Sequence, residues 1–374
     1  MNESIMSKGT IGRRSFMKRL GVAGAAAALP VGTLLSSQRR AGARGFSTGR
    51  ALSGGDAAIL RFLAAAELIE ADLWTQYAEL GGIGDNPPIE VDPGQTLNNY
   101  QSALSNLDSD GPQYISSNTL DEVSHAAFLN AFLESRGVEP VNFDEFRTLD
   151  GSTATGSSGI KRLTNLMHLN VDTSWYVRYR SATNPDLGAT FPQAIDLNDV
   201  TAIPITDADF NDPNHIQAIA NTAAFHFGYI EQGGSSLYAA MSQKATSSEV
   251  LQITLGIGGD EIAHFLEWVD FSGNGVQAPV APLTDPVSGV TFPDFFNPLN
   301  PLIQPSLIFP VPCEFISPEL PHVSIIRPLT DRFGGAVATI ASFTADGLFI
   351  GQSRRFLELL QSLANEADAA SRGF

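Results

Sequence analysis

Residues 259–268 read G-D-E-I-A-H-F-L-E-W, and residues 120–129 read L-D-E-V-S-H-A-A-F-L. Each stretch has Asp-Glu followed by His three positions after the Glu. The two pairs are Glu122/His125 and Glu261/His264. Side chains at i and i+3 lie on one face of a helix, so the Glu and His of each pair can reach one metal ion. The chain therefore contains the same candidate ligand pair twice, about 140 residues apart.

A third Glu-x-x-His spacing, Glu319/His322, is excluded as a ligand pair. Pro318 and Pro321 flank it in a stretch that we do not expect to be helical. The first two pairs lie among apolar helical neighbours, which predicts that they face a core. A buried carboxylate needs a counter-charge, and a divalent metal ion supplies one.

Four segments have the apolar periodicity of long helices. They cover about residues 56–80, 119–135, 213–241 and 247–271. A long connection, residues 138–212, joins the second to the third and contains a further helix expected near 161–180. This order predicts an all-α fold: a four-helix bundle of ferritin-like connectivity, with a long crossover between helices 2 and 3.

The rest of the chain is divided by composition. Residues 1–43 are expected to be a signal peptide, 44–272 the bundle, and 273–374 an extension. The extension begins with an irregular Pro-rich stretch, 278–328, and ends in a helical segment at about 335–370.

A dinuclear carboxylate site in such a bundle needs one Glu-x-x-His from each of two helices and one Glu from each of the other two. The helix at 213–241 offers Glu231. The helix at 56–80 offers Glu67 and Glu70, which share a face. An aromatic residue seven positions after Glu67 matches the Glu231/Tyr238 spacing and favours Glu67. Because Glu70 also has an aromatic residue at that distance, it stays an alternative ligand.

The motifs A-A-E-L-I-E-A-D-L-W, D-E-V-S-H-A-A-F-L, Y-I-E-Q-G-G-S-S-L-Y and D-E-I-A-H-F-L-E-W resemble the ferritin-like domain family of exported and desiccation-related proteins. The resemblance covers about residues 56–272 and implies a ferritin-like bundle. The wider di-iron carboxylate proteins use six ligands in this pattern. Carried over by position, they are Glu67, Glu122, His125, Glu231, Glu261 and His264.

The same resemblance implies a role for the Asp that precedes each pair. In related di-iron proteins this Asp accepts the second ring N–H of the histidine on the opposite helix, which fixes its tautomer. Asp121 and Asp260 match those positions. Two other polar residues are expected outside the site: His226 as a core or surface group, and Glu267 as a solvent-facing acid.

Oxygen and imidazole ligands without sulfur favour two iron or manganese ions, with zinc as the alternative. The only cysteine, Cys313, rules out an intramolecular disulfide and a thiolate cluster. The expected function is that of an oxidoreductase acting with O₂ or peroxide, or a ferroxidase. The alternative is a non-catalytic stress- or desiccation-related scaffold on the same bundle.

The N-terminus has the pattern of a twin-arginine signal peptide. Residues 12–18 read G-R-R-S-F-M-K, an apolar run covers 21–35, and A-G-A follows at 41–43. The alternative is a membrane anchor, but 15 apolar residues are short against the roughly 20 that a membrane span needs. We therefore expect export to the periplasm, the cell surface or the medium.

The net charge of the chain limits the classes of partner that we expect it to bind. Residues 1–43 hold seven of the 22 basic residues and one of the 40 acidic ones, so cleavage would leave 15 and 39, a net charge of −24. Such a protein attracts cations and repels nucleic acid and anionic membranes. The expected partners are metal ions and O₂ or peroxide; the sequence does not predict the oligomeric state.

Overall fold

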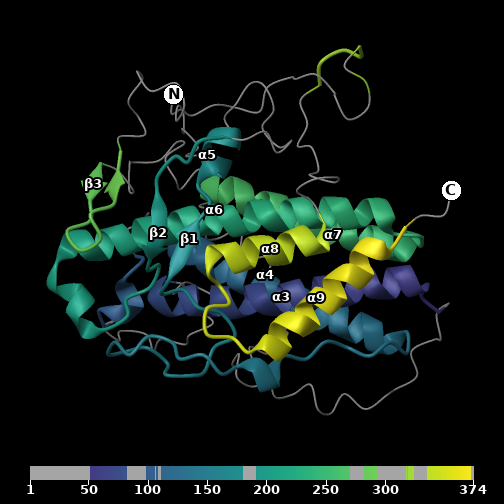
Figure 1. The fold of residues 1–374 in the computed structure, drawn as a ribbon, viewed down its shortest axis with the longest axis horizontal. Coiled ribbons are helices and arrows are strands. Elements are labelled where there is room, and N and C mark those ends of the chain that lie inside the picture. The colour runs from purple at the N-terminus through teal and green to yellow at the C-terminus, as the bar shows by residue number, and fades with distance from the viewer. Residues whose placement is uncertain are drawn as a thin grey trace, which may run out of the picture. The chain divides into compact units, whose positions relative to one another are not determined.

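The computed structural model describes most of the chain between residues 51 and 371. The described residues are 51–81, 98–105, 107, 111–179, 191–269, 282–293, 317, 319–323 and 335–371. The predicted signal peptide, Cys313 and much of the Pro-rich stretch lie outside them. Within these ranges the fold is mostly helical, in agreement with the predicted all-α class (Figure 1). The helices are α3 (Gly54–Gly81), α4 (Gly111–Ser135), α5 (Ser174–Tyr179), α6 (Pro213–Lys244), α7 (Ser248–Val269), α8 (Ala336–Asp346) and α9 (Arg354–Ala369).

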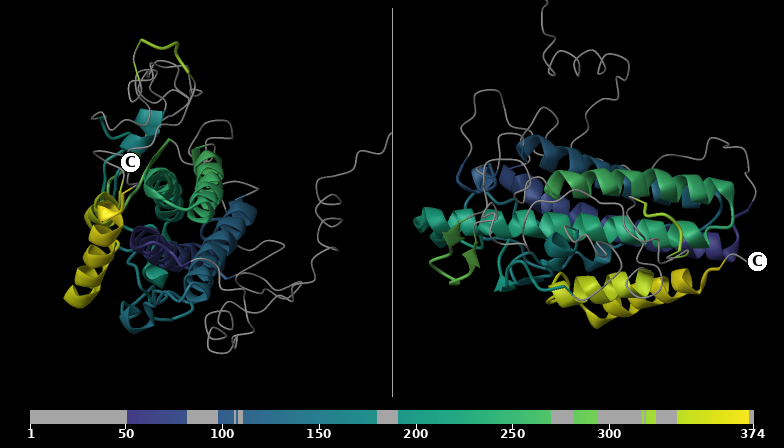
Figure 2. Two further views of the ribbon diagram at one scale, coloured as in Figure 1. Left: turned by 90° about the vertical axis from the view of Figure 1, so that its right-hand side faces the viewer. Right: turned by 90° about the horizontal axis from the view of Figure 1, so that it is seen from above.

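The four long helices pack in two pairs, α3 with α4 and α6 with α7. The pairs contact each other through α3 with α6 and through α4 with α7. Figure 2 (left) looks along these helices and shows α3 and α4 in purple and blue beside α6 and α7 in teal and green. The inner faces are apolar and belong to one continuous buried core. The core-facing sides of all four helices are thus brought near one another.

Side-chain caps explain where several helices begin. The Ser53 hydroxyl accepts the backbone N–H of Asp56 at 3.0 Å, and Asp212 accepts that of Asn214 at 2.9 Å before Pro213. The carboxylate of Asp56 is itself buried and accepts the N–H of Thr246 at 2.8 Å in the turn between α6 and α7. The start of α3 is therefore bonded to the α6–α7 turn.

The second long helix begins eight residues earlier than the sequence predicts, at Gly111 and not at 119. Ser and Asn in this segment favour turns locally. Their tertiary contacts reverse that preference: Asn118 accepts a hydrogen bond at 2.7 Å from the indole of Trp268 on α7, and Ile115 is fully buried.

The helix expected near 161–180 is mostly absent: only α5 is helical there, and β1 (Leu169–Val171) pairs antiparallel with β2 (Leu197–Val200). Backbone groups that such a helix would use bond to other segments instead: the N–H of Asn165 donates to the carbonyl of Leu348 at 2.8 Å, and the carbonyl of Leu166 accepts the N–H of Ala202 at 2.9 Å. The buried carboxylate of Asp72 on α3 accepts the N–H groups of Leu163 at 3.0 Å and Thr164 at 2.9 Å, which holds the irregular segment against α3. A second small antiparallel pair consists of β3 (Leu283–Thr284) and β4 (Thr291–Phe292).

The C-terminal helical segment is interrupted where the sequence predicts one helix over 335–370. Gly347 has φ 96° and Gly351 φ 89°, a left-handed conformation that favours glycine, and these residues separate α8 from α9. Helix α9 packs on α3, and α8 contacts α6; both appear in yellow in Figure 1. The same hydrophobic core continues into both helices. None of the helices in the described ranges combines the length and apolar character needed to cross a bilayer.

Candidate metal centre

The six residues predicted as ligands are all buried between the four long helices. Their exposed fractions range from 0% to 8%. Helix α3 contributes Glu67, and α6 contributes Glu231. Helix α4 contributes Glu122 and His125, and α7 contributes Glu261 and His264. Carboxylates and imidazoles from four helices are thus gathered in one apolar interior.

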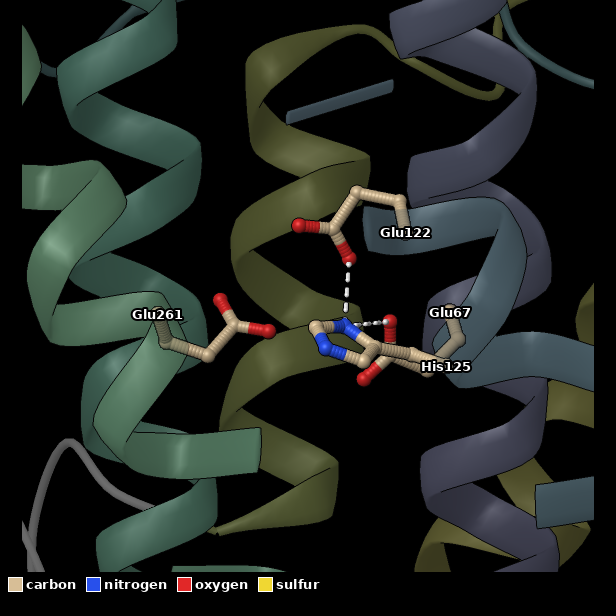
Figure 3. A group of neighbouring side chains, drawn as sticks. All are labelled: Glu67, Glu122, His125 and Glu261. Carbon is tan, nitrogen blue, oxygen red and sulfur yellow. Dashed lines mark hydrogen bonds and ion pairs between the residues drawn. The ribbon is translucent and has the colours of Figure 1, made fainter. Parts of the chain in front are cut away.

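One group consists of Glu67, Glu122, His125 and Glu261, with one potential ligand atom of each within 4.8 Å of the others. Figure 3 shows the three carboxylates directed at one another around the imidazole of His125. The Nδ1 atom of His125 lies 3.3 Å from Oε2 of Glu122 and 3.4 Å from Oε2 of Glu67. Three oxygens and one ring nitrogen can therefore surround one position.

A second group consists of Glu122, Glu231 and His264 within the same distance limit. Here Nδ1 of His264 lies 3.1 Å from Oε1 of Glu122 and 3.2 Å from Oε2 of Glu231. Glu122 belongs to both groups, and its two oxygens face different histidines. A carboxylate in that position can bridge two adjacent ions.

The outer ring nitrogen of each histidine faces an aspartate across the α4–α7 interface. His125 Nε2 lies 3.2 Å from Oδ2 of Asp260, and His264 Nε2 lies 3.3 Å from Oδ2 of Asp121. The aspartates are partly exposed, 41% and 38% for their side chains, so they form the solvent side of the site. Each histidine can donate Nε2–H outward and keep Nδ1 available to a metal ion inside.

Several carboxylate oxygens at the centre accept no hydrogen bond from the residues that the structure describes. Oε2 of Glu67 and Oε1 of Glu122 still lie within ion-pair distance of a histidine ring nitrogen, at 3.4 and 3.1 Å, whereas the two oxygens of Glu261 have neither kind of partner in the described ranges. An unpaired buried carboxylate is costly, and coordination to a cation removes that cost. The donor set of carboxylate oxygens and imidazole nitrogens suits iron, manganese or zinc. The buried Glu and His clusters could therefore hold a metal ion.

Burial and the short distances between these charged groups shift the pKa values of the carboxyl groups and of His125. Burial and the nearby Glu67 carboxylate raise the pKa of Glu122 to about 8, and burial raises the pKa of Glu261 well above its usual value. Burial opposes a charge on His125, yet the Glu122 and Glu67 carboxylates outweigh it and raise its pKa to about 11. Without a metal ion, Glu122 and Glu261 thus retain protons, and His125 becomes the counter-charge of Glu67, whose pKa is lowered because the imidazole outweighs its burial.

Two aromatic donors hold the outer ligands. The indole Nε1 of Trp74 on α3 donates to Oε1 of Glu231 at 2.9 Å, and the Tyr238 hydroxyl on α6 donates to Oε1 of Glu67. The predicted seven-residue spacing pairs each glutamate with an aromatic residue on its own helix. In the structure the hydrogen bonds cross between the two helices instead. Each donor leaves the other oxygen of its glutamate directed toward a histidine.

Gly234, which the sequence prediction did not include, makes room for Glu261. A Cβ atom at Gly234 would lie 1.9 Å from Oε2 of Glu261, whereas one at Gly233 would have nothing within 4 Å. Glycine in the interior of a helix is costly, so its presence at 234 signals a close approach. The G-G pair directly after Y-I-E-Q was the available clue.

Other predicted residues lie at the edge of the centre or elsewhere. Glu70 is buried beside it but belongs to neither ligand group. Glu267, expected to face solvent, is half-buried and accepts a hydrogen bond from Asn118 at 3.1 Å. His226, expected to be either a core or a surface group, is a fully buried core residue. Glu319 and His322 are exposed and not helical.

Comparison of the chain with protein-family models, with curated proteins and with solved structures finds no match. The interpretation of the centre therefore depends on its own geometry and chemistry.

Proposed function

We propose that this chain is an exported ferritin-like protein that binds two iron or manganese ions and reacts with O₂ or peroxide. The observation that carries the proposal is the position of Glu122. Its Oε2 lies 3.3 Å from Nδ1 of His125, and its Oε1 lies 3.1 Å from Nδ1 of His264. One buried carboxylate between two buried imidazoles has the arrangement of a bridging ligand with one capping histidine on each side.

The pairing of the helices supports the ferritin-like part of the proposal. α3 and α4 form one pair, α6 and α7 the other, and the long segment between α4 and α6 connects the pairs. In the proposed bundle that segment is the crossover between helices 2 and 3. Each helix supplies the ligand types that the dinuclear pattern requires: one Glu from α3 and α6, and Glu with His from α4 and α7.

Each side chain has a defined role in the proposed site. Glu67 and Glu231 would each offer one oxygen to an ion, and Tyr238 and Trp74 hold these glutamates by donating to their other oxygens. Glu122, whose two oxygens face different histidines, would contribute to both ion positions, and Glu261 would add a carboxylate on the His125 side. His125 and His264 would each bind one ion through Nδ1. Their outer ring nitrogens face Asp260 and Asp121, respectively.

When bound, an iron or manganese pair supplies redox equivalents and Lewis acidity toward O₂ or peroxide. The chain contributes a buried interior, in which the six residues are at most 8% exposed and the indole of Trp74 contacts Glu231. In that interior the negative ligands attract cations strongly, because charges interact more strongly where water is excluded. Oxidation of ferrous ions, oxidation of an organic substrate and disproportionation of peroxide all use such a site.

The proposal includes export of the folded, loaded protein by the twin-arginine route, because that route carries folded proteins. The signal is the R-R-S-F-M-K stretch, which lies outside the described residues. The net charge of −24 after removal of residues 1–43 fits a protein without nucleic-acid or membrane partners.

The activity is tested with protein loaded anaerobically with Fe(II) or Mn(II) and then exposed to O₂ or peroxide. We expect consumption of the oxidant by the loaded protein and none by a Glu261→Ala variant treated in the same way. Metal binding without any consumption would favour a structural metal site in a stress-related scaffold, the alternative function for this fold.

A further inference from the structure

A second buried polar cluster lies outside the metal ligands and joins three helices. The hydroxyl of Tyr77 on α3 lies 2.5 Å from Nδ1 of His226 on α6. The Nε2 atom of the same ring lies 2.9 Å from Oδ2 of Asp346, the last residue of α8. The three side chains are at most 1% exposed. A tyrosine, a histidine and an aspartate thus form a dry hydrogen-bonded row.

The proton positions in this row depend on the tautomer of His226. We assign the bond at Nε2 of His226 to a ring N–H donated to Asp346, which leaves Nδ1 as the unprotonated nitrogen and makes Tyr77 the donor to it. The other oxygen of Asp346, Oδ1, has no partner among the described residues. A carboxylate held this way can stabilise a positive imidazole, as carboxylates do for histidine bases in general.

Aromatic rings connect Tyr77 to the metal centre. Tyr77 and Trp74 are one helical turn apart on α3, with ring centroids 5.8 Å apart, and both contact Phe227, at 4.6 and 4.9 Å. The indole of Trp74 donates directly to Glu231. The path from Tyr77 to a proposed metal ligand therefore passes through one fully buried indole.

We propose that Tyr77 is a redox-active residue that donates one electron to the oxidised metal pair through Trp74 while its phenolic proton moves to Nδ1 of His226. The inference rests on the function proposed above, since the metal pair is the oxidant. The O–H bond of Tyr77 breaks and an N–H bond forms on His226. The products are a neutral tyrosyl radical, an imidazolium paired with Asp346, and a metal pair reduced by one electron.

The surroundings of Tyr77 favour loss of its electron together with its phenolic proton over loss of the electron alone. Burial and the charge of Asp346 raise the pKa of Tyr77 well above its usual value, so the phenol does not ionise by itself. Removing only an electron would leave a cation in an apolar interior, which is costly. A base in contact with the hydroxyl avoids that state, and exclusion of water protects the radical.

The test uses the full-length metal-loaded protein. Each sample is assayed for metal, oxidised with O₂ or peroxide, frozen and examined by electron paramagnetic resonance, with ring-deuterated tyrosine to identify the radical. We expect a tyrosyl signal in the wild-type protein, its loss in Tyr77→Phe and its persistence in Tyr100→Phe. Tyr100 is a matched control because it is also buried, and its pKa is also raised by burial, but it lies on another element.

A second readout needs neither metal nor variant. Nitrogen-15 resonances of His226 in the metal-free protein should show a proton on Nε2 and an unprotonated Nδ1. A proton on Nδ1 would overturn the proposal, because that nitrogen could not accept the phenolic proton.

In the radical measurement on loaded protein, His226→Gln should also abolish the tyrosyl signal while metal content stays unchanged.

The outcomes separate this inference from the proposed function. Loaded samples without a tyrosyl radical, or a radical that survives in Tyr77→Phe, overturn the redox role of Tyr77 and leave the metal site standing. Samples that bind no metal overturn both proposals.

Discussion

His125 on α4 and Asp260 on α7 face each other, with 3.2 Å between Nε2 and Oδ2. The relationship is reciprocal: His264 on α7 faces Asp121 on α4 at 3.3 Å. Each helix therefore supplies one imidazole and the carboxylate that orients the other helix's imidazole. In each D-E-x-x-H motif, the Asp acts on the partner motif and the Glu-His pair faces the centre.

Replacing Asp260 by Asn should weaken metal binding without removing the site. The amide no longer offers a charged acceptor to Nε2–H of His125, and loss of such an outer partner typically costs about 10- to 100-fold in metal affinity. Competition with a chelator measures the effect. Asp150→Asn is the control, because Asp150 is exposed and pairs with Lys161 at the surface. Equal affinity in both variants would contradict the role of Asp260.

Gly234→Ala and Gly233→Ala form a matched pair of neighbouring helix positions. The new methyl group at 234 would lie 1.9 Å from Oε2 of Glu261 and displace that carboxylate, whereas the one at 233 meets nothing within 4 Å. We expect Gly234→Ala to lose metal. Gly233→Ala should keep it and gain roughly 0.5–1 kcal/mol of stability from its better helix propensity. Metal content and thermal unfolding of both variants check this, and full loading of Gly234→Ala would refute the proposed position of Glu261.

Replacing Glu67 or Glu70 by Gln, one at a time, shows which of the two is the metal ligand on α3. Glu67 lies in the ligand group and is hydrogen-bonded by Tyr238, whereas Glu70 lies outside both groups. Burial and the negative charges of Glu122 and Glu67 raise the pKa of Glu70 well above its usual value. We expect Glu67→Gln to reduce bound metal and Glu70→Gln to retain it. Metal analysis of the two purified variants decides the matter; the reverse result would make Glu70 the α3 ligand.

The metal-free protein should become less stable as the pH rises from about 5 to 8. Glu122 has its pKa raised from 4.5 to about 8, so folding takes up a proton in that range and its contribution falls with rising pH. His125, with a pKa raised from 6.5 to about 11, contributes fully below 6.5 and loses its contribution as the pH rises toward 11. Each group changes the unfolding free energy by up to about 1.4 kcal/mol per pH unit.

Denaturant unfolding of chelator-treated protein at several pH values measures this trend. The metal-loaded protein should not show the same decline, because the ions replace the protons on the ligands and bind better as the pH rises. A metal-free protein whose stability increases between pH 5 and 8 would contradict the assigned proton affinities.

The residues that gather at the candidate centre could be predicted from sequence, because a shared metal site needs a fixed helical spacing between Glu and His. Both Glu-x-x-His pairs lie on apolar helical faces, and packing of those faces in the core brings the two pairs together. The choice between Glu67 and Glu70 could not be made, since both lie on one face and only the rotation of α3 against its neighbours separates them. Gly234 was missed because its importance depends on a side chain from another helix.

The errors in the fold have similar causes. The segment 161–173 has local helical character, but Asn165 N–H donates to the carbonyl of Leu348 and the carbonyl of Leu166 accepts the N–H of Ala202. The start of α4 has turn-forming residues, but contacts of Asn118 with Trp268 hold it in a helix. In both places a long-range polar contact outweighs local propensity, and no periodicity in the sequence reports it.

The central claim is that Glu122 bridges two metal ions. The most direct measurement is the metal content per chain of protein exported in its folded state from its native host, compared with that of the Glu122→Ala variant prepared in the same way. Two iron or manganese ions per wild-type chain, with both lost in the variant, is the predicted result. Fewer than about one ion per wild-type chain, or a variant that retains two, would contradict the account.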